Sequence, residues 1–435
     1  MNQSIKLERQ QAEKPKLNIT LTGICLAVML LCGLAVGTLP QTLIAFVVIV
    51  CSGILFFSKG IWLAFPIMIF YYESFGILFG MSVYRYFTFI FLFYILLTSK
   101  NFTLKFSHIV PIVIFAIYSI VIVAPDDIRR AIFVVLDVVC IWLLISCFLN
   151  ELEHLKSFFR VYVFTALCAF ITGTIINSTR VINQVIGGEL VEIARNYGTF
   201  EDPNYMGLFY SVAVFAIMSL SLFPKVWRIV LVISLTAMML TTLSITALLV
   251  NIVFWLIYLF ANKKINIVTF CCFILVLVAL LGLYSYGVNN PDTPVIGNFV
   301  LRIQDKLDSL SSGDINEVTT NRTELTQRHW DYFWEQPVLK MLFGMNPASV
   351  LKTDIGGYKS AAHNEYVDLL LNIGILGTLL YLGVMFTRTA KSFIRVRRDG
   401  DAYSNCIFMM KVIWLAYGLT LTMFGDYRFM LLFLI

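Results

Sequence analysis

Long apolar runs separated by short polar breaks dominate the chain, and this pattern predicts a bundle of membrane-spanning helices. Apolar runs of spanning length lie at about residues 17–37, 41–58, 61–80, 83–98, 107–124, 131–149, 158–177, 204–223, 227–243, 246–262, 265–286, 365–386 and 406–424. A last apolar piece starts at Phe429, but its seven residues would span only about 10 Å as helix and cannot cross alone. We therefore predict an all-α polytopic membrane protein with about 13–14 transmembrane helices.

The polar breaks divide the chain into membrane and loop parts. We expect a cytoplasmic leader at 1–16, transmembrane bundles at 17–177 and 204–286, outer loops at 178–203 and 287–362, and C-terminal transmembrane helices at 363–435. The second outer loop is too long to be a simple connector, so we expect it to carry function and interfacial helices.

Basic residues set the predicted orientation. If the N-terminus is cytoplasmic, alternate crossings place most basic loop residues on that same side, as membrane proteins prefer. These residues are Lys59, Lys100, Lys105, Lys225, Arg228, Lys263, Lys264, Arg388, Lys391, Arg395, Arg397 and Arg398. The exception is the pair Arg129 and Arg130, which shares an outer turn with Asp126 and Asp127. Both long loops then face outward.

Composition agrees with a membrane protein and excludes several other classes. The chain is 59% hydrophobic and 13% charged, with a mean hydropathy of +0.84. All nine cysteines fall inside apolar runs, which suits small buried side chains better than disulfides or metal sites. The net charge of +6 is concentrated on one side of the bilayer, so no nucleic-acid partner is expected. A cleavable signal peptide is not expected either, because a full-length span follows the basic leader without a small-residue cleavage site.

The end of the first outer loop carries polar residues at the predicted start of a helix. Asp202 suits the N-cap and Pro203 the first helical position, which places Asn204 in the first turn. Arg195 lies a few residues upstream, near backbone N–H groups that favour anions. An arginine there suits an anionic headgroup, because its fork can bind two phosphate oxygens. The alternative is a loop arginine that faces water or lipid phosphate.

The second outer loop contains one clear helix signature. Asn321 suits a cap and Glu324 stands three residues later, before an apolar pattern with two tryptophans that stops at Pro337. Tryptophans opposite a polar face suggest a helix in the headgroup layer. Arg322 lies in the first turn of this helix and Arg328 lies further along. The alternative interpretation makes Arg322 an exposed charge at a helix end.

Residues 360–381 join polar chemistry directly to a membrane span. His363 and Asn364 precede a long apolar run that contains Gly374 and Gly377, and at about 100° per residue His363 and both glycines share one helix face. Glycines on such a face let another span approach closely. Asp368, in the first turns, would face the same cavity. A neutral His363 is able to accept a proton from a sugar hydroxyl, although a single histidine at a membrane surface is often without special function.

Two acids lie within apolar runs, and both a functional and a structural role stay open for them. Glu73 and Asp137 are predicted at membrane depth, where ionisable groups usually face the interior or a wet cavity. A carboxyl bonded to a backbone or tyrosine donor is an equally good explanation.

No metal or cofactor is expected from the sequence. The outer loops lack cysteine and lack the spacings H-x-x-x-H and D-x-D, so arginines would have to neutralise an outgoing phosphate. The chain also lacks a glycine-rich phosphate loop, which argues against nucleotide-driven pumping.

Three motifs together resemble one family. His363-Asn364 followed by Gly374 and Gly377, the stretch from Arg195 to Asn204, and Arg322-Thr-Glu-Leu at the head of a loop helix resemble the O-antigen polymerase and ligase superfamily. Members are integral-membrane glycosyltransferases that use polyprenyl-diphosphate-linked oligosaccharides. The resemblance covers roughly residues 190–390 and depends on the order of the motifs and on the topology.

The resemblance implies a GT-C-like helical fold in the bacterial plasma (inner) membrane, with a metal-independent active site that faces outward. Arg195 and Arg322 would bind the diphosphate of an undecaprenyl-linked donor, His363 would activate the acceptor hydroxyl, and Asn364 would orient it. Asp202, Asn204 and Asp368 are further candidates for substrate binding. Expected partners are the lipid-linked donor, a glycan acceptor and the bilayer, with flippase and chain-length-regulator proteins nearby.

The sequence departs from the family pattern at several points. Many relatives are expected to carry an arginine after a serine near residue 245, where this chain reads Ser244-Ile245-Thr246. The turn after the loop helix reads Gly344-Met-Asn instead of a glycine pair, and the chain stops soon after Arg428. Arg328 or Arg428 is therefore a candidate to complete the diphosphate site.

Three functions fit these features. The first is a polymerase that joins lipid-linked repeat units into a capsule, exopolysaccharide or O-antigen. The second is a ligase that transfers a finished glycan from the same carrier to another acceptor, and the sequence does not separate the two. The third, from another class, is a lipid-linked oligosaccharide flippase or other transporter. It would need basic residues around a mid-membrane cavity, and basic residues are nearly absent from the interiors of the spans.

Overall fold

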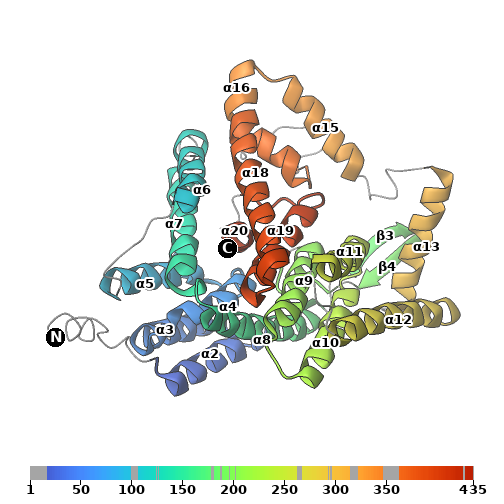
Figure 1. Cartoon of the computed structure of the whole chain (residues 1–435), viewed down its shortest axis with the longest axis horizontal. Helices are drawn as coiled ribbons and strands as arrows, with labels where there is room; N and C mark the ends of the chain where they lie inside the picture. Colours follow the sequence, from blue (N-terminus) through green and yellow to red (C-terminus); the bar gives the residue numbers. More distant parts are fainter. Residues whose placement is uncertain are drawn as a thin grey trace. The chain divides into compact units, whose positions relative to one another are not determined.

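The protein consists of two compact units, Met1–Asn101 and Phe102–Ile435, and Figure 1 shows the ribbon coloured along the chain. The computed structural model describes residues 17–98, 106–123, 125, 127–177, 181–186, 189–194, 196–200, 202–261, 267–291, 293, 296–313, 322–345, 362–424 and 427–434.

The first unit contains three long helices and a short broken segment. Its elements are α2 (Ile19–Leu34), α3 (Gln41–Ser58), the 3-10 helix η1 (Ile61–Ala64), α4 (Phe65–Phe70), the antiparallel strands β1 (Ile77–Leu78) and β2 (Met81–Ser82), and α5 (Val83–Thr98). Helices α2 and α3 pack together, and α3 also packs on α5.

The prediction of a continuous span at 61–80 is wrong. Helix α4 ends at Phe70 and a tight turn follows, so the apolar run is split between a short helix and a β-hairpin. Gly76 and Gly80 both have positive φ angles, of 81° and 77°, which allow the hairpin to form where a helix would otherwise continue. Glu73 is exposed in the turn that follows α4 and is not part of a helix.

The second unit is a larger helical assembly. Its helices are α6 (Phe106–Ile117) continued by the π-helical segment η2 (Tyr118–Val123), α7 (Ile128–Leu144) continued by the π-helical segment η3 (Ile145–Leu149), α8 (Leu152–Asn177), α9 (Pro203–Leu220), α10 (Lys225–Thr241), α11 (Ile245–Ala261), α12 (Ile267–Asn289), α13 (Ile296–Ser312), α15 (Arg322–Trp334), α16 (Val338–Phe343), α18 (Glu365–Asp399), α19 (Ala402–Tyr417) and α20 (Tyr427–Leu434). One antiparallel hairpin, β3 (Val181–Ile186) with β4 (Glu189–Ala194), forms in the predicted first outer loop.

Helix α9 forms the centre of this unit. Every residue of α9 except Tyr205 is buried, and the helix packs against α8, α10, α11 and α19. Hydrogen bonds between side chains link α9, α11 and α19 inside the apolar core. The Asn251 amide donates to Ser211 Oγ at 2.8 Å, and Ser211 Oγ lies 3.1 Å from the Tyr417 hydroxyl. Each such bond contributes about 1 kcal/mol and fixes the register of the helices.

The protein is an all-α polytopic membrane protein. Among the described residues, five helices are long and apolar enough to span a membrane, namely Gln41–Ser58, Ile128–Leu149, Leu152–Ile175, Pro203–Leu220 and Glu365–Asp399. Further apolar helices have only 10–17 residues, so the number of 13–14 spans stays a prediction. Large apolar side chains face outward, as on Leu96 (73% exposed) and Phe260 (71% exposed), which suits contact with lipid.

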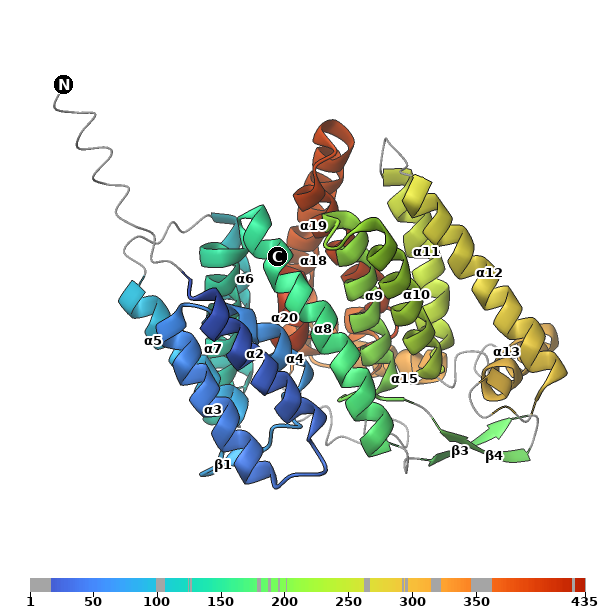
Figure 2. The ribbon, with the colours of Figure 1, turned by 90° about the horizontal axis from the view of Figure 1, so that it is seen from below.

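The polar elements of the second unit gather at one end of its helices. Figure 2 shows α13, α15 and the β3–β4 hairpin together at one end of α9 to α12. Helix α13 packs on α12, while α15 and α16 pack on α18. The prediction of a helix at Arg322 that stops before Pro337 is confirmed by α15. Helix α15 buries Leu325, His329 and Phe333.

Candidate active site

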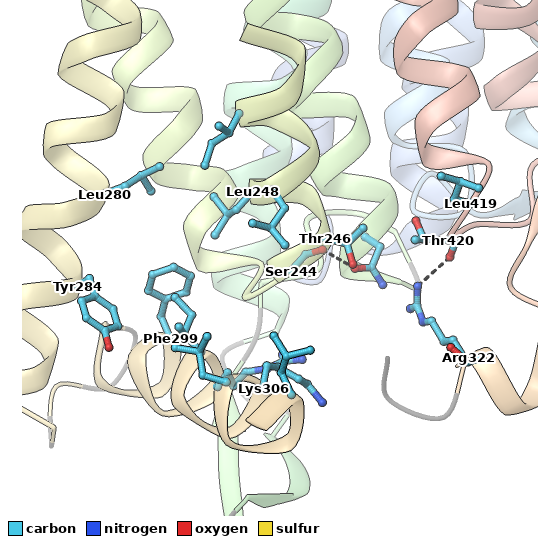
Figure 3. A pocket seen from close by; sticks show the side chains of 18 of the residues that line it. Ser244, Thr246, Leu248, Leu280, Tyr284, Phe299, Lys306, Arg322, Leu419 and Thr420 are labelled. Atoms are coloured by element: carbon cyan, nitrogen blue, oxygen red, sulfur yellow. Dashed lines mark hydrogen bonds between the residues drawn. The ribbon is translucent and has the colours of Figure 1, made fainter. Parts of the chain in front are cut away.

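A cavity of about 990 Å³ opens among the polar elements of the second unit. Its walls come from α11, α12, α13 and α15, and the heads of α9 and α18 and the segment after α19 complete it. Figure 3 shows this arrangement. The lining residues are Asn204, Ser244, Thr246, Leu248, Leu249, Ile252, Leu277, Leu280, Leu281, Tyr284, Phe299, Arg302, Ile303, Lys306, Leu307, Leu310, Arg322, Thr323, Thr326, Gln327, Asn364, Leu419 and Thr420.

One half of the cavity is an apolar wall built from helical faces. Helix α12 presents Leu277, Leu280, Leu281 and Tyr284, which follow the spacing of one side of an α-helix. Helices α11 and α13 add further leucine, isoleucine and phenylalanine side chains. In Figure 3, Leu248, Leu280 and Phe299 face the same space from three different helices. This wall suits a long hydrocarbon chain.

The head of α9 forms part of the polar half. The predicted N-cap is confirmed, because Asp202 Oδ1 accepts from the Asn204 backbone N–H at 2.7 Å and Pro203 is the first helical residue. The same Asp202 oxygen accepts from the Asn204 side-chain amide at 2.7 Å. The side-chain Oδ1 of Asn204 in turn accepts from Ser244 Oγ at 2.5 Å. Asn204 is thus oriented from two sides where it lines the cavity.

Arg322 reaches the cavity from the first turn of α15. Its Nη1 donates to the Thr420 carbonyl oxygen at 2.7 Å, a bond drawn in Figure 3. Further along the same helix, Thr326 Oγ1 donates to the Ala362 carbonyl oxygen at 3.2 Å. Helix α15 is therefore tied both to the segment after α19 and to the residue before His363.

His363 occupies a special backbone position just before α18. Its φ angle is 51°, in the left-handed region that residues other than glycine seldom adopt. Asn364 is the N-cap of α18, and its Oδ1 accepts from the backbone N–H groups of Tyr366 at 3.0 Å and Val367 at 3.4 Å. Asn364 also lines the cavity, whereas His363, its neighbour in the chain, does not.

The charges around His363 favour its neutral form. Burial lowers the pKa of His363 from its ordinary value of 6.5, and the positive charge of Arg322 lowers it further. The negative charge of Asp202 opposes this shift, and His329 adds to it. His363, Arg322 and Asp202 come from three separate parts of the chain, and both charges act on the His363 ring. The imidazole is therefore mainly unprotonated at neutral pH.

Two buried acids at the start of α18 hold this region in place. Glu365 Oε2 accepts from the backbone N–H groups of Met423 at 2.6 Å and Phe424 at 2.9 Å. Asp368 accepts from the Thr422 hydroxyl, and its Oδ1 also accepts from the Ala362 backbone N–H at 3.2 Å. Asp368 does not line the cavity, contrary to our expectation, because it points into these bonds.

Helix α18 differs from the predicted continuous helix at Gly374. Gly374 has φ 67° and ψ −177°, a non-helical conformation that kinks α18, so His363, Gly374 and Gly377 do not share one helical face. A side chain at Gly374 would collide with backbone atoms of Leu342 and Phe343 in α16. The neighbour that Gly374 admits is therefore α16, a helix of the predicted second outer loop, and not a predicted span.

The remaining arginines predicted from the sequence lie elsewhere or outside the described residues. Arg195 is outside them. Arg328 pairs with Glu324 one turn earlier on α15 and does not line the cavity. Arg428 stacks over the Phe200 and Tyr205 rings, with its Cζ 5.4 and 5.9 Å from the ring centroids, and does not line the cavity either.

Sequence reasoning missed the contribution of α13. This helix places Arg302 and Lys306 on the cavity wall, one turn apart, beside apolar residues of the same face. Lys306 Nζ lies 3.8 Å from Asp305 Oδ2. The detectable signal was the spacing of apolar residues three and four positions apart among charged residues in 296–312, which is typical of an amphipathic helix.

Comparison with known families matches the part of the chain that contains most of the cavity. Residues 229–382 match the family model described as O-antigen ligase, roughly a third of the 435-residue chain. The matched segment runs from α10 into α18 and includes Ser244, Arg302, Arg322 and His363. No curated protein sequence matches the chain. The family suggests a glycosyltransferase-like activity, and the matched domain supports placing this chain in the O-antigen ligase and polymerase superfamily as an O-antigen ligase-like membrane enzyme.

Proposed function

We propose that the protein polymerises polyprenyl-diphosphate-linked oligosaccharide repeat units at the outer face of the bacterial plasma membrane. The observation that carries this proposal is the two-sided cavity. Apolar side chains form one wall, and Arg322, Asn204 and Asn364 lie at the other end. A polyprenyl diphosphate is itself two-sided, with an apolar tail and an anionic head. A cavity of about 990 Å³ accommodates the head and the first isoprene units, and the rest of the tail extends into lipid.

Arg322 binds the donor diphosphate in this proposal. A guanidinium carries five N–H donors, so the bond to Thr420 fixes its position and leaves other donors for phosphate oxygens. In the reaction, charge grows on the leaving diphosphate, and a fixed arginine stabilises it most in the transition state. Arg195 would bind the same group from the first outer loop.

His363 acts as the general base. The acceptor hydroxyl oxygen attacks the anomeric carbon of the donor's reducing-end sugar, the bond from that carbon to the phosphate oxygen breaks, and polyprenyl diphosphate leaves with the electron pair. The hydroxyl proton goes to the neutral imidazole, and Asn364 orients the hydroxyl. General-base assistance of this kind typically contributes about 10²–10⁴-fold. The reaction is metal-independent in this proposal, because arginines neutralise the diphosphate.

The polymerase and ligase reactions use the same donor site and differ in the acceptor. A polymerase transfers the growing chain to the next lipid-linked unit, while a ligase transfers it to a different acceptor. Flippase and chain-length-regulator proteins are expected partners of the polymerase. A membrane fraction supplied with only lipid-linked single units separates these possibilities, since a polymerase forms longer glycans and a ligase does not.

The proposed function is tested by replacing His363 and Arg322 in cells. We expect His363→Ala to abolish polymer while the protein still inserts and lipid-linked single units accumulate at the outer face. Accumulation at the inner face instead would identify a flippase. We expect Arg322→Lys to retain little activity, because the lysine ammonium acts as a point charge and cannot donate two parallel hydrogen bonds. Normal polymer from His363→Ala would overturn the assignment of the base.

A further inference from the structure

Arg302 is the most unusual charged residue of the cavity. It lies on α13, is only 7% exposed, and lines the cavity with Lys306 one turn away. Its Nε and Nη1 atoms are buried and have no hydrogen-bond partner among the described residues. We propose that Arg302 binds a phosphate of the polyprenyl-diphosphate donor opposite Arg322, an assignment that rests on the proposed function.

A buried arginine with two unbonded nitrogens is unfavourable, which points to a site for an anion. Burying an ion removes it from water, and the loss is offset only by good hydrogen bonds or an opposite charge. The negative charge of Asp305 acts on Arg302, but this acid also pairs with Lys306. The positive charge of Arg322 acts on Arg302 as well. Two cations held at one cavity are stabilised when an anion lies between them.

The arrangement suits a diphosphate better than a single phosphate. Figure 3 shows Lys306 on α13 and Arg322 on α15 at the polar end of the cavity, with Phe299 and Tyr284 towards the apolar wall. Arg302 belongs to the same face of α13 as Phe299 and Lys306, three and four residues away. One phosphate is bound by Arg322 and the second by Arg302 with Lys306, while the tail follows α12 and α13.

The experiment measures binding of three probes to the purified full-length chain in lipid nanodiscs. Farnesyl diphosphate, farnesyl monophosphate and farnesol share one tail and differ in head charge. The variants are Arg302→Gln, Arg302→Met and, as a matched control, Arg129→Gln. Arg129 is an exposed arginine of α7 that does not line the cavity.

We expect Arg302→Gln to weaken binding of farnesyl diphosphate by about 10- to 100-fold, the range for losing hydrogen bonds to a charged group. Monophosphate binding should fall less and farnesol binding should not change. Arg129→Gln should bind all three probes as the original protein does. Without ligand, Arg302→Met should unfold at the same temperature as the original protein or higher, because it removes a buried charge with two unbonded nitrogens.

Each outcome decides the assignment. Equal diphosphate binding by Arg302→Gln and the original protein overturns it and leaves the proposed function standing. An equal loss for farnesol and farnesyl diphosphate also overturns it, because Arg302 then supports the shape of the cavity. If the original protein binds none of the three probes, the proposed function and the Arg302 assignment both fail. Diphosphate binding that depends on Arg302, in a protein that makes no longer glycan, supports Arg302 and contradicts the polymerase.

Discussion

Replacing Gly374 by alanine disturbs the contact between α16 and the kinked helix α18. Gly344 and Gly374 form this contact reciprocally. A side chain at Gly344 would collide with the backbone of Asn372 and Ile373, and one at Gly374 would collide with the backbone of Leu342 and Phe343. Both glycines have backbone angles that side-chain-bearing residues avoid, with φ 97° and ψ 179° at Gly344.

The expected loss of stability has two parts. The backbone conformation of Gly374 costs alanine about 1–3 kcal/mol, because it lies in a region that is essentially restricted to glycine. The added methyl group must displace the backbone of α16, and such overpacking costs about 1–3 kcal/mol more. Together these terms give about 2–6 kcal/mol, a large share of the ~5–15 kcal/mol that stabilises a typical protein.

The same change should also reduce activity. Phe333, Met345, Ala362, Val367 and Leu371 form one buried cluster that joins α15, the turn after α16 and α18. Ala362 precedes His363 directly, so displacement of α16 moves the backbone that positions the base. We expect glycan transfer to fall together with stability.

Thermal unfolding of the purified chain in detergent, with Gly383→Ala as control, measures this effect. Gly383 lies on the same helix α18 in helical conformation, and a side chain there meets no atom within 4 Å. Alanine at that position should leave stability unchanged or raise it by up to about 1 kcal/mol. The reasoning is refuted if Gly374→Ala unfolds at the same temperature as Gly383→Ala.

Three further predictions concern the polar end of the cavity. Ser244→Ala should lower the free energy of unfolding by about 1–3 kcal/mol, because it leaves the buried Asn204 oxygen without its donor; unchanged chemical denaturation would contradict this. The rate of glycan transfer should fall as the pH drops through the pKa of His363, which lies below 6.5, since only the neutral ring accepts a proton. In NMR titrations of the His363 ring, Arg322→Gln should raise the pKa of His363 because a positive charge is lost, and Asp202→Asn should lower it because a negative charge is lost; shifts of opposite sign would refute the electrostatic account.

Local cap chemistry made part of the site predictable. Asp202 with Pro203 marked the start of α9, and the pattern from Asn321 to Glu324 predicted the helix that begins at Arg322, although the predicted cap Asn321 itself lies outside the described residues. These signals depend on a few neighbouring residues, so they can be read without knowledge of tertiary packing.

Features that depend on packing were not predictable in the same way. The apolar run that contains Gly374 fits a straight helix, and only α16 packed against it explains the kink. The direction of Asp368 is likewise decided by Thr422, a residue far along the chain. Arg302 was missed because its burial depends on α12 and on the cavity, not on its neighbours in sequence. Hydropathy alone also merged the short helix α4 with the hairpin that follows it.

The most direct test of the central claim is glycan transfer by the purified chain in proteoliposomes. The substrate is an undecaprenyl-diphosphate-linked repeat unit, and the products measured are longer glycan and released undecaprenyl diphosphate, with a chelator present. We predict that the original protein releases one undecaprenyl diphosphate for each repeat unit that it transfers. We predict that His363→Ala and Arg322→Ala form neither product. Undiminished transfer by either variant, or release of the lipid without a longer glycan, would contradict the account.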